Sequence, residues 1–373
     1  MTTTASKSNL PFIAGSGGDL SPLATSFLSA LLGGNRREAA HRILKAVETG
    51  TSVQEVYLDV FQPVQYLVGE LWQTGRIGVA QEHFCSASVQ LVMSQLYPRI
   101  FSTEKKGRTL VAACVGDELH EIGIRMVADF FELDGWDTYY LGANMPTESI
   151  LRAVREEEAD VAAISVSMAF HIDAVPTLIK EIRASDSEVR ILVGGRQFNL
   201  SPDLWRRVGA DGFAPNAAEA VRVADLMFLP GQGVSAPGAL GSAGAPARNE
   251  TLSLLKSLRQ ELVAETASAW TARMRTSGVT MDRTEDKMLS GATFMVSTLE
   301  SVMAVGDLGL LDDQASWTRV HLGSKGLSPG LLSTMLSDYR AIALKRLPRE
   351  NSAEVLPHIS ALIHMLGNDG LDA

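Results

Sequence analysis

The sequence predicts a helical cap, a doubly wound α/β domain and a further all-α domain, in that order along the chain. Three observations indicate this fold class. Apolar residues recur at helical spacing from residue 21 to about 100, strand-like and helical segments alternate from about 107 to 228, and helical spacing returns from residue 251. The length of 373 residues also exceeds that of a usual single domain.

The first hundred residues predict a tail followed by a bundle. Residues 1–20 are rich in Thr, Ser and Gly, which indicates a disordered tail. From 21 to 104 the apolar spacing predicts four helices separated by short breaks that contain Gly. These helices lie near residues 22–32, 37–47, 53–72 and 79–96. Connections this short favour an antiparallel four-helix bundle.

Residues 105–228 have the alternating pattern of a parallel sheet covered by helices. Strands are predicted near 109–115, 137–141, 160–165 and 190–194, with a weak fifth at 212–214, and helices near 120–134, 147–157 and 173–184. Ligands of such sheets bind at the carboxyl ends of the strands. His120, Ser165 and Gly194 all follow or end a predicted strand, which predicts a single site at that edge.

The last third of the chain predicts a separate helical unit. Residues 229–250 are rich in Gly, Ala, Pro and Ser with almost no charge, which is typical of a flexible linker. From 251 to 373 only helical patterns occur, near 251–274, 284–305, 328–346 and 352–366. We expect an all-α domain that serves output, dimerisation or ligand binding.

Composition narrows the function classes. The net charge of −10 argues against nucleic acid as a direct partner, because phosphate contacts require clustered Lys and Arg. No apolar run reads as a signal peptide or as a membrane span, so no membrane association is expected. Cys85 and Cys114 are too few for a disulfide framework, which favours reduced core thiols and a cytoplasmic location.

The run Glu118-Leu119-His120-Glu121-Ile122-Gly123 stands between a predicted strand and a predicted helix. A carboxylate two residues before a histidine can bind one ring nitrogen and leave the other for a metal. Gly123 removes a side chain where a bulky ligand would pass the backbone. An exposed loop histidine followed by a helix is the alternative interpretation of the run.

This run resembles the Asp-x-His-x-x-Gly signature of cobalamin-binding domains, with Glu118 in place of the usual Asp. The resemblance implies that His120 is the lower axial ligand of cobalt in a base-off cofactor. It also implies that the hydroxyl-bearing strand end and the paired glycines lie along the nucleotide tail of cobalamin. The residues concerned are Ser165, Ser167, Gly194 and Gly195. The match is partial, because the Leu of the family's Ser-x-Leu-like segment is missing and Ser167 and Met168 stand there.

A second pattern occurs in the predicted cap, where Trp72 is followed after nine residues by Glu82-His83. Trp at a helix end is commonly a core residue, and Glu-His early in a helix commonly faces water. Jointly the three resemble the Trp-x9-Glu-His motif of light-sensing cobalamin photoreceptors of the CarH type. That resemblance implies adenosylcobalamin under a four-helix cap, with Trp72 beside the adenosyl group and Glu82 and His83 on its sugar.

The same resemblance implies a non-enzymatic signalling protein in which photolysis of the cobalt–carbon bond changes domain or subunit contacts. We therefore expect a homo-oligomer with light-dependent assembly and a separate output protein. Two departures are visible: Gln73 stands where those regulators have a histidine, and no DNA-binding helix-turn-helix precedes the bundle.

The C-terminal third resembles that of photocobilins, which carry a linear tetrapyrrole beside cobalamin. This implies a second chromophore, biliverdin or another bilin, among residues such as Trp270, Met288, Trp317 and His321. The alternative is that these side chains are ordinary residues of a helical core.

The alternative function is a corrinoid methyl carrier of a methyltransferase system. Such carriers also pair a helical cap with a cobalamin-binding sheet domain, and they move the cofactor between active sites. A cobalamin-dependent mutase subunit is disfavoured, because the sequence has no (β/α)8 pattern for a substrate barrel.

Overall fold

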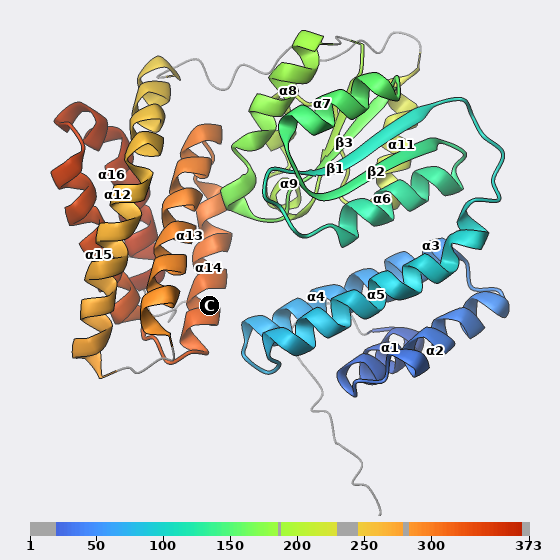
Figure 1. Ribbon diagram of the computed structural model, residues 1–373, viewed down its shortest axis with the longest axis horizontal. Helices are drawn as coiled ribbons and strands as arrows, with labels where there is room; N and C mark the ends of the chain where they lie inside the picture. The colour runs from blue at the N-terminus through green and yellow to red at the C-terminus, as the bar shows by residue number, and fades with distance from the viewer. Residues whose placement is uncertain (1–19, 186–187, 230–244, 279–282, 368–373) are drawn as a thin grey trace, which may run out of the picture.

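The computed structural model describes residues 20–185, 188–229, 245–278 and 283–367, so the tail predicted at 1–20 lies almost wholly outside the described residues. A blue helical cap, a green α/β domain and an orange-to-red helical bundle lie around a common centre (Figure 1). The predicted fold class is confirmed: helices precede a parallel sheet, and further helices follow it.

The cap consists of helices, the first three of which begin at polar N-cap residues. Its elements are α1 Pro22–Leu32, α2 Arg36–Glu48, α3 Val53–Val56, the π-helical turn η1 Tyr57–Phe61, α4 Gln62–Gln73 and α5 Val79–Ile100. The side chains of Ser21, Asn35 and Ser52 each accept a backbone N–H of the first helical turn. The third predicted helix is therefore continuous from α3 to α4, with a π turn in its middle.

The α/β domain contains five parallel strands in the order β2-β1-β3-β4-β5. They are β1 Thr109–Val115, β2 Asp137–Met145, β3 Val161–Ser165, β4 Arg190–Gly194 and β5 Gly212–Phe213. Strand β2 lies on one side of β1, and the chain then crosses to the other side, where β3 pairs with β1. Open sheets bind ligands at this reversal point, beyond the carboxyl ends of the strands. The fold thus directs a ligand to the loops after β1 and β3.

Helices cover both faces of the sheet. One face packs on α6 Ile122–Leu133 and α11 Ala217–Met227, and the other on α7 Thr147–Glu156, α8 Ala174–Ser185 and α10 Leu204–Val208. The short helix α9 Arg196–Leu200 follows β4 directly. Alternate β1 residues therefore enter different cores, with Leu110 and Ala112 facing α6 and Val111 and Ala113 facing the opposite layer.

The cap is bound to the outer side of α6. Met126 and Phe130 of that helix belong to the core of the cap, and the ring of Phe130 lies 6.1 Å from that of Tyr57. The Tyr57 hydroxyl donates to Oδ2 of buried Asp129 at 2.7 Å. Burial raises the pKa of Asp129 to about 6, although the Tyr57 hydrogen bond and the charge of Arg125 oppose the shift.

We expect Asp129→Asn to become increasingly stabilising, relative to the unchanged protein, as the pH rises from 4 to 7.5. A carboxyl group whose pKa is raised by folding contributes stability below its unfolded pKa, and this contribution is lost as the pH rises through its folded pKa of about 6. Asn keeps the acceptor for Tyr57 without ionising. The difference in unfolding free energy between the variant and the unchanged protein should therefore grow by about 2 kcal/mol over this pH range. Urea unfolding at several pH values measures it.

The matched control for this prediction is Asp59→Asn, which removes an exposed carboxylate from the same cap. The control should show no comparable trend with pH. A constant difference in unfolding free energy between Asp129→Asn and the unchanged protein at all pH values would contradict the prediction.

The C-terminal helices form a bundle beside the sheet domain. They are α12 Ala245–Ser277, α13 Thr284–Val305, α14 Gly309–Gly323, α15 Pro329–Arg346 and α16 Arg349–Gly367. The linker predicted at 229–250 is too long at its end, because α12 begins at residue 245, and residues 230–244 lie outside the described part. The sequence also missed α14, since glycines flank it at 306, 309, 323 and 326 and resemble loop signals.

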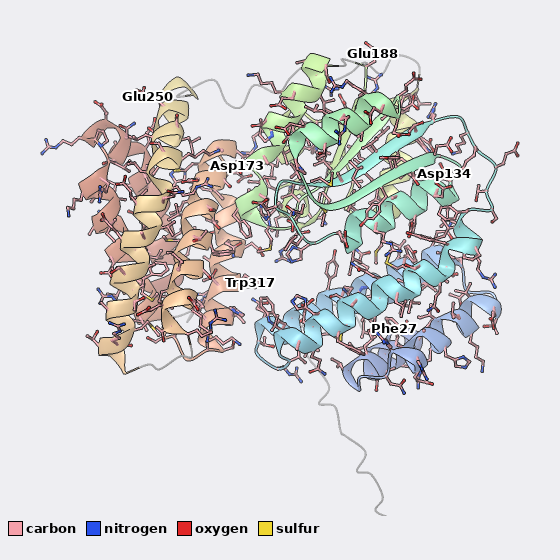
Figure 2. All side chains as sticks on the ribbon, viewed as in Figure 1. Phe27, Asp134, Asp173, Glu188, Glu250 and Trp317 are labelled. Atoms are coloured by element: carbon pink, nitrogen blue, oxygen red, sulfur yellow. The ribbon has the colours of Figure 1, made fainter. Side chains whose placement is uncertain are left out.

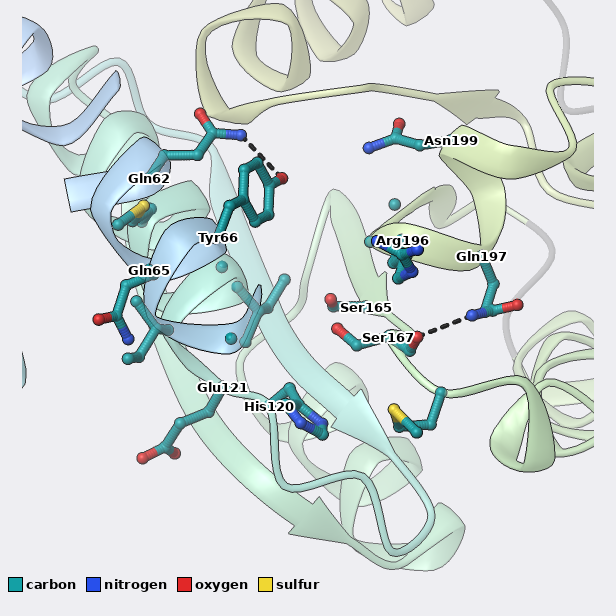
Figure 3. A pocket seen from close by; sticks show the side chains of 18 of the residues that line it. Gln62, Gln65, Tyr66, His120, Glu121, Ser165, Ser167, Arg196, Gln197 and Asn199 are labelled. Atoms are coloured by element: carbon teal, nitrogen blue, oxygen red, sulfur yellow. Dashed lines mark hydrogen bonds between the residues drawn. The ribbon is translucent and has the colours of Figure 1, made fainter. Parts of the chain in front are cut away.

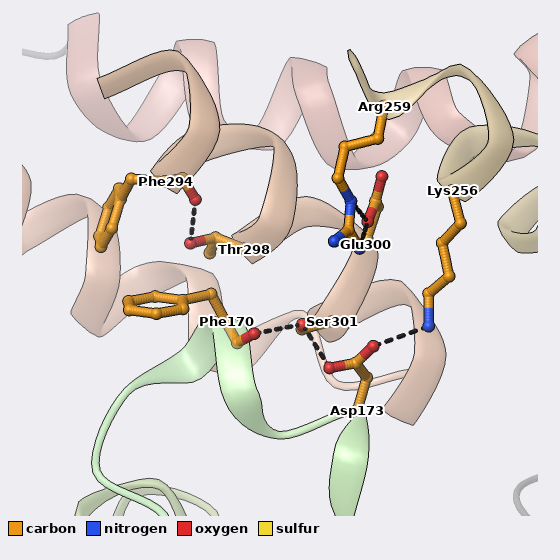
Figure 4. A network of polar contacts seen from close by, with 8 residues as sticks. All are labelled: Phe170, Asp173, Lys256, Arg259, Phe294, Thr298, Glu300 and Ser301. Carbon is orange, nitrogen blue, oxygen red and sulfur yellow. Dashed lines mark hydrogen bonds and ion pairs between the residues drawn. The ribbon is translucent and has the colours of Figure 1, made fainter. Parts of the chain in front are cut away.

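A polar network joins this bundle to the turn after β3, the 3-10 helix η2 Ala169–His171 (Figure 4). The hydroxyl oxygen of Ser301 on α13 lies 2.9 Å from both the Phe170 carbonyl oxygen and Oδ1 of Asp173, and its one hydrogen is shared between these two acceptors. Lys256 of α12 binds the other oxygen of Asp173 at 2.8 Å. The C-terminal bundle is thus attached to the loop region at the carboxyl edge of the sheet.

One expectation about membranes needs correction. Within the described residues, α13 has the length and hydropathy of a membrane span, contrary to the expectation that no run would. Length and composition alone are weak evidence, because 61% of its most apolar window is buried inside the protein. The helix is apolar on several sides because it packs on α12 and on η2 at once.

The two cysteines, Cys85 and Cys114, are buried and free.

Candidate functional site

A cavity of about 1130 Å³ lies between the cap, the carboxyl edge of the sheet and α14. This volume is above the range of about 300–1,000 Å³ that is usual for small-molecule pockets. Figure 3 shows Gln62 and Tyr66 of the cap on one side, and His120, Ser165 and Ser167 on the other. The structure brings nine of the ten site residues from the sequence to its wall: Trp72, Glu82, His83, His120, Gly123, Ser165, Ser167, Gly194 and Gly195.

The tenth residue, Glu118, lies behind the wall and holds His120. It is fully buried, and its Oε1 lies 2.5 Å from Nδ1 of His120. The side chain of His120 is 62% exposed, so the ring is accessible although one nitrogen is engaged. A carboxylate on Nδ1 leaves Nε2 as the nitrogen that can bind a metal.

Glu118 is itself held by a turn far away in the sequence. Its Oε2 accepts the backbone N–H groups of Ser167 and Met168, each at 2.8 Å. Burial opposes ionisation of Glu118, but the hydrogen bond and charge of the His120 side chain, together with the backbone N–H groups of His120 and Met168, lower its pKa to about 2. The hydrogen bond to Glu118 in turn raises the pKa of His120. The carboxylate is therefore ionised and locks the orientation of the ring.

The three glycines of the site have different physical roles. A Cβ on Gly123 would project into open space, so its absence enlarges the cavity at the start of α6. Gly195 has a φ of +90°, and a Cβ there would lie 2.5 Å from the Val166 carbonyl oxygen. A Cβ on Gly194 would lie 3.2 Å from the Ala214 carbonyl oxygen. The chain's own packing therefore already requires Gly195, apart from any ligand.

The cap residues lie at one end of the cavity. Trp72 is half-buried near the end of α4, while Glu82 and His83 open α5 across the intervening turn. Glu82 accepts the hydroxyl of Ser86 at 2.8 Å and lies 3.1 Å from Nδ1 of His83. The side chain of His83 is 75% exposed, which places it at the rim.

Several lining residues have no recognisable sequence signal. Glu121 accepts hydrogen bonds from Gln90 of the cap and from Tyr140 of β2, both at 3.0 Å, and so ties the cap to the His120 loop. Gln197 of α9 donates to the Ser167 carbonyl at 2.8 Å. The C-terminal helix α14 adds Asp313, Gln314 and Trp317 to the wall. Only tertiary contacts reveal the roles of these groups, because Glu121 occupies a variable position of the Glu118–Gly123 run and the others lie outside both motifs of the site.

The site fits a corrinoid by three properties of its residues. The loop after β1 presents one imidazole with a free Nε2, Gly123 leaves the space beside it open, and the cavity exceeds the size of ordinary metabolite pockets. Residues predicted for a bilin separate in the structure: Trp270 and Met288 are buried in the C-terminal bundle, whereas Trp317 and His321 face the cap.

Comparisons with known proteins agree with this chemistry. Residues 108–222 match a family model described as "B12 binding domain", and residues 23–97 match a second model with the same description. Dimethylamine corrinoid protein 3 of Methanosarcina acetivorans is 28% identical over 129 residues, or 34% of this chain and 59% of that protein. Dimethylamine corrinoid protein 2 of the same organism is 24% identical over 198 residues, or 50% of this chain and 89% of that protein.

A solved structure shows the same fold. The monomethylamine corrinoid protein of Methanosarcina barkeri superposes with a TM-score of 0.50 at 18% identity, over 55% of this chain and 98% of that chain. At this identity the likeness concerns the fold alone. Together with the two domain matches, the comparisons show a cobalamin-binding protein whose cofactor is a corrinoid.

The light-sensing function predicted from Trp72, Glu82 and His83 is wrong. The relatives that match include dimethylamine and monomethylamine corrinoid proteins, and they favour the alternative methyl-carrier interpretation. They give no support to a signalling role or to a bilin. The physical reason is that these three side chains line the cap side of the cavity, and their types do not specify which upper ligand a bound cofactor would carry.

Proposed function

We propose that this protein is a corrinoid carrier that transfers methyl groups between separate enzymes. The observation that carries the proposal is the His120–Glu118 pair, which presents an accessible imidazole held by a buried carboxylate to a large cavity between cap and sheet. The names of the relatives support the same function class. Bound cobalamin would supply a cobalt centre that accepts and releases a methyl group.

The chain's own residues would hold and cover the cofactor. His120 would be the lower ligand of cobalt, oriented by Glu118, and the open space at Gly123 would admit the corrinoid next to the backbone. Ser165, Ser167 and the glycines after β4 would lie along the nucleotide tail, at the reversal point of the sheet. Trp72, Glu82 and His83 would cover the opposite side of the ring.

The carrier would not be an enzyme by itself. It would act in the cytoplasm with a methyltransferase that loads the methyl group and another protein that removes it. Self-association of the chain stays a prediction, and so does a separate protein partner. The upper ligand originally expected, an adenosyl group, is the alternative to methyl in the experiment below.

The proposal is tested with the purified protein charged with isotopically labelled methylcobalamin. We expect the label to remain on the protein in buffer and to leave it, in the form of a methylated small molecule, when extract of the source cells is added. The His120→Ala variant, treated identically, is the control for label that is bound non-specifically. The readout is protein-bound label after gel filtration, together with the labelled product.

Two results would overturn the carrier function. The first is label that stays on the protein in active extract. The second is marked preference for adenosylcobalamin over methylcobalamin in a competition titration, since a carrier must accommodate the methyl form.

A further inference from the structure

Helix α14 of the C-terminal bundle forms part of the cavity wall, although both domain matches end at or before residue 222. Its residues Asp313, Gln314 and Trp317 line the cavity together with those of the cap and the sheet. In Figure 2 Trp317 extends from the bundle toward the cap. A segment outside the matched domains therefore contributes directly to the proposed corrinoid site.

An aromatic cluster joins α14 to the cap at Trp72. The ring of Trp317 lies 5.7 Å from that of Trp72, and the ring of His321, one turn further along α14, lies 4.8 Å from Trp72. Trp317 and His321 stack on each other at 5.0 Å with an angle of 17°. Burial and the charge of Lys325 lower the pKa of His321, which favours the neutral ring in this stack.

Two polar contacts continue from this aromatic cluster along both sides of the cavity. Together with the cluster, they form the seam between α14 and its two neighbours. On the cap side, Nε2 of Gln73 donates to the Trp317 carbonyl at 3.2 Å. On the sheet side, Arg196, which directly follows the glycine pair after β4, binds Asp313 at 2.6 Å. Helix α14 thus connects the end of the cap with the turn after β4 and closes the gap between them.

The contacts of α14 across the cavity involve no residue of the cap's hydrophobic core. The Arg196 and Asp313 side chains are 52% and 26% exposed, and ion pairs this exposed contribute little to stability. The contacts of α14 with the cap consist of the aromatic cluster and single hydrogen bonds rather than a shared hydrophobic core. The wall is therefore closed in this structure by weak contacts across the cavity, whereas Leu310, Leu311 and Ala315 hold α14 in the core of the bundle and Arg207 binds Asp307 directly before the helix.

We propose that α14 is a movable third wall of the corrinoid cavity, and that Trp317, placed against Trp72, limits both the group carried above the corrin ring and the access of external molecules to it. This inference rests on the proposed function in one respect, namely that a corrinoid occupies the cavity. It assigns to the C-terminal bundle control of access to the cofactor.

The test measures the access of a small anion to bound cobalamin. The unchanged protein and its variants are loaded with hydroxocobalamin, and the replacement of the upper ligand by cyanide is followed by absorbance. Trp317→Ala removes the ring, and Asp313→Lys places a like charge against Arg196 while leaving the aromatic cluster intact. We expect both variants to react about tenfold faster than the unchanged protein, because a closed wall slows entry.

The matched control is Val320→Ala on the exposed side of α14, which should react at the unchanged rate. A second readout needs no cofactor: in the corrinoid-free protein, hydrogen exchange of 309–323 should be faster in Asp313→Lys than in Val320→Ala. Circular dichroism and urea unfolding exclude variants that do not fold, and Asp313→Lys remains informative if Trp317→Ala fails to fold.

The outcomes separate the two proposals. Normal cobalamin binding with unchanged cyanide rates in Trp317→Ala and Asp313→Lys would overturn the wall and leave the carrier function standing. An unchanged protein that does not bind cobalamin would overturn the carrier function. In that case faster hydrogen exchange in Asp313→Lys than in Val320→Ala would still support the inference that the Arg196–Asp313 contact keeps α14 in place. Equal exchange in the two variants would refute that inference.

Discussion

Replacing His120 by Ala is expected to lower cobalamin affinity by about 100-fold or more, since even outer partners of metal ligands contribute factors of about 10–100. His120 presents the one accessible imidazole whose other nitrogen is held by a buried carboxylate at the carboxyl edge of the sheet. Its loss would remove the proposed protein ligand of cobalt and leave only the proposed contacts with the ring and tail. Equilibrium dialysis and the absorbance spectrum of bound methylcobalamin measure the effect.

Two variants sharpen this experiment. His41→Ala removes an exposed histidine from α2 of the cap and should bind cobalamin like the unchanged protein. His120→Gly should regain part of its affinity, and the spectrum of the bound form, when free imidazole is added, because imidazole can enter the vacated space as a ligand. Unchanged affinity and spectrum in His120→Ala would refute the site.

The second large effect is expected for Glu118→Ala, which should weaken cobalamin binding by about 10–100-fold. The variant frees the ring of His120 and leaves the N–H groups of Ser167 and Met168 without their acceptor. Loss of a buried acceptor should also lower the unfolding free energy of the cofactor-free protein by about 1–3 kcal/mol. Dialysis with cobalamin and urea unfolding without it separate the two effects.

Glu118→Gln provides a graded comparison, since its amide oxygen can still accept one of these hydrogen bonds but carries no charge. We expect its affinity to lie between those of Glu118→Ala and the unchanged protein. Asp117→Ala removes an exposed carboxylate from the same loop and is the matched control. Equal affinities for Glu118→Ala and Asp117→Ala would show that Glu118 does not position the ligand.

Much of the fold could be predicted because its signals are local. The strand at 109–115, the helices that flank it and the bundle before it follow from apolar spacing over neighbouring residues. The pairing of Glu118 with His120 is also local, since the two residues stand two positions apart in one loop. The position of this loop after the first strand then follows from the general placement of ligands on parallel sheets.

Other parts of the site depend on contacts that periodicity does not encode. The N–H group of Ser167 that holds Glu118 lies 49 positions away, and the contact of Gln73 with Trp317 spans 244 positions. Gly195 is required by its contact with Val166 and its left-handed φ, a reason that a pair of glycines in the sequence does not reveal.

The sequence by itself therefore determined the order of the domains, the edge of the sheet that carries the site and the likeness to cobalamin-binding domains. Only the tertiary structure decided which carboxylate oxygen holds His120, what fixes that carboxylate, and that α14 closes the cavity. The physical reason is that secondary structure and short motifs depend on neighbouring residues. A cavity wall is formed by side chains such as those of Trp72 and Trp317, which come into contact only when separate domains pack together.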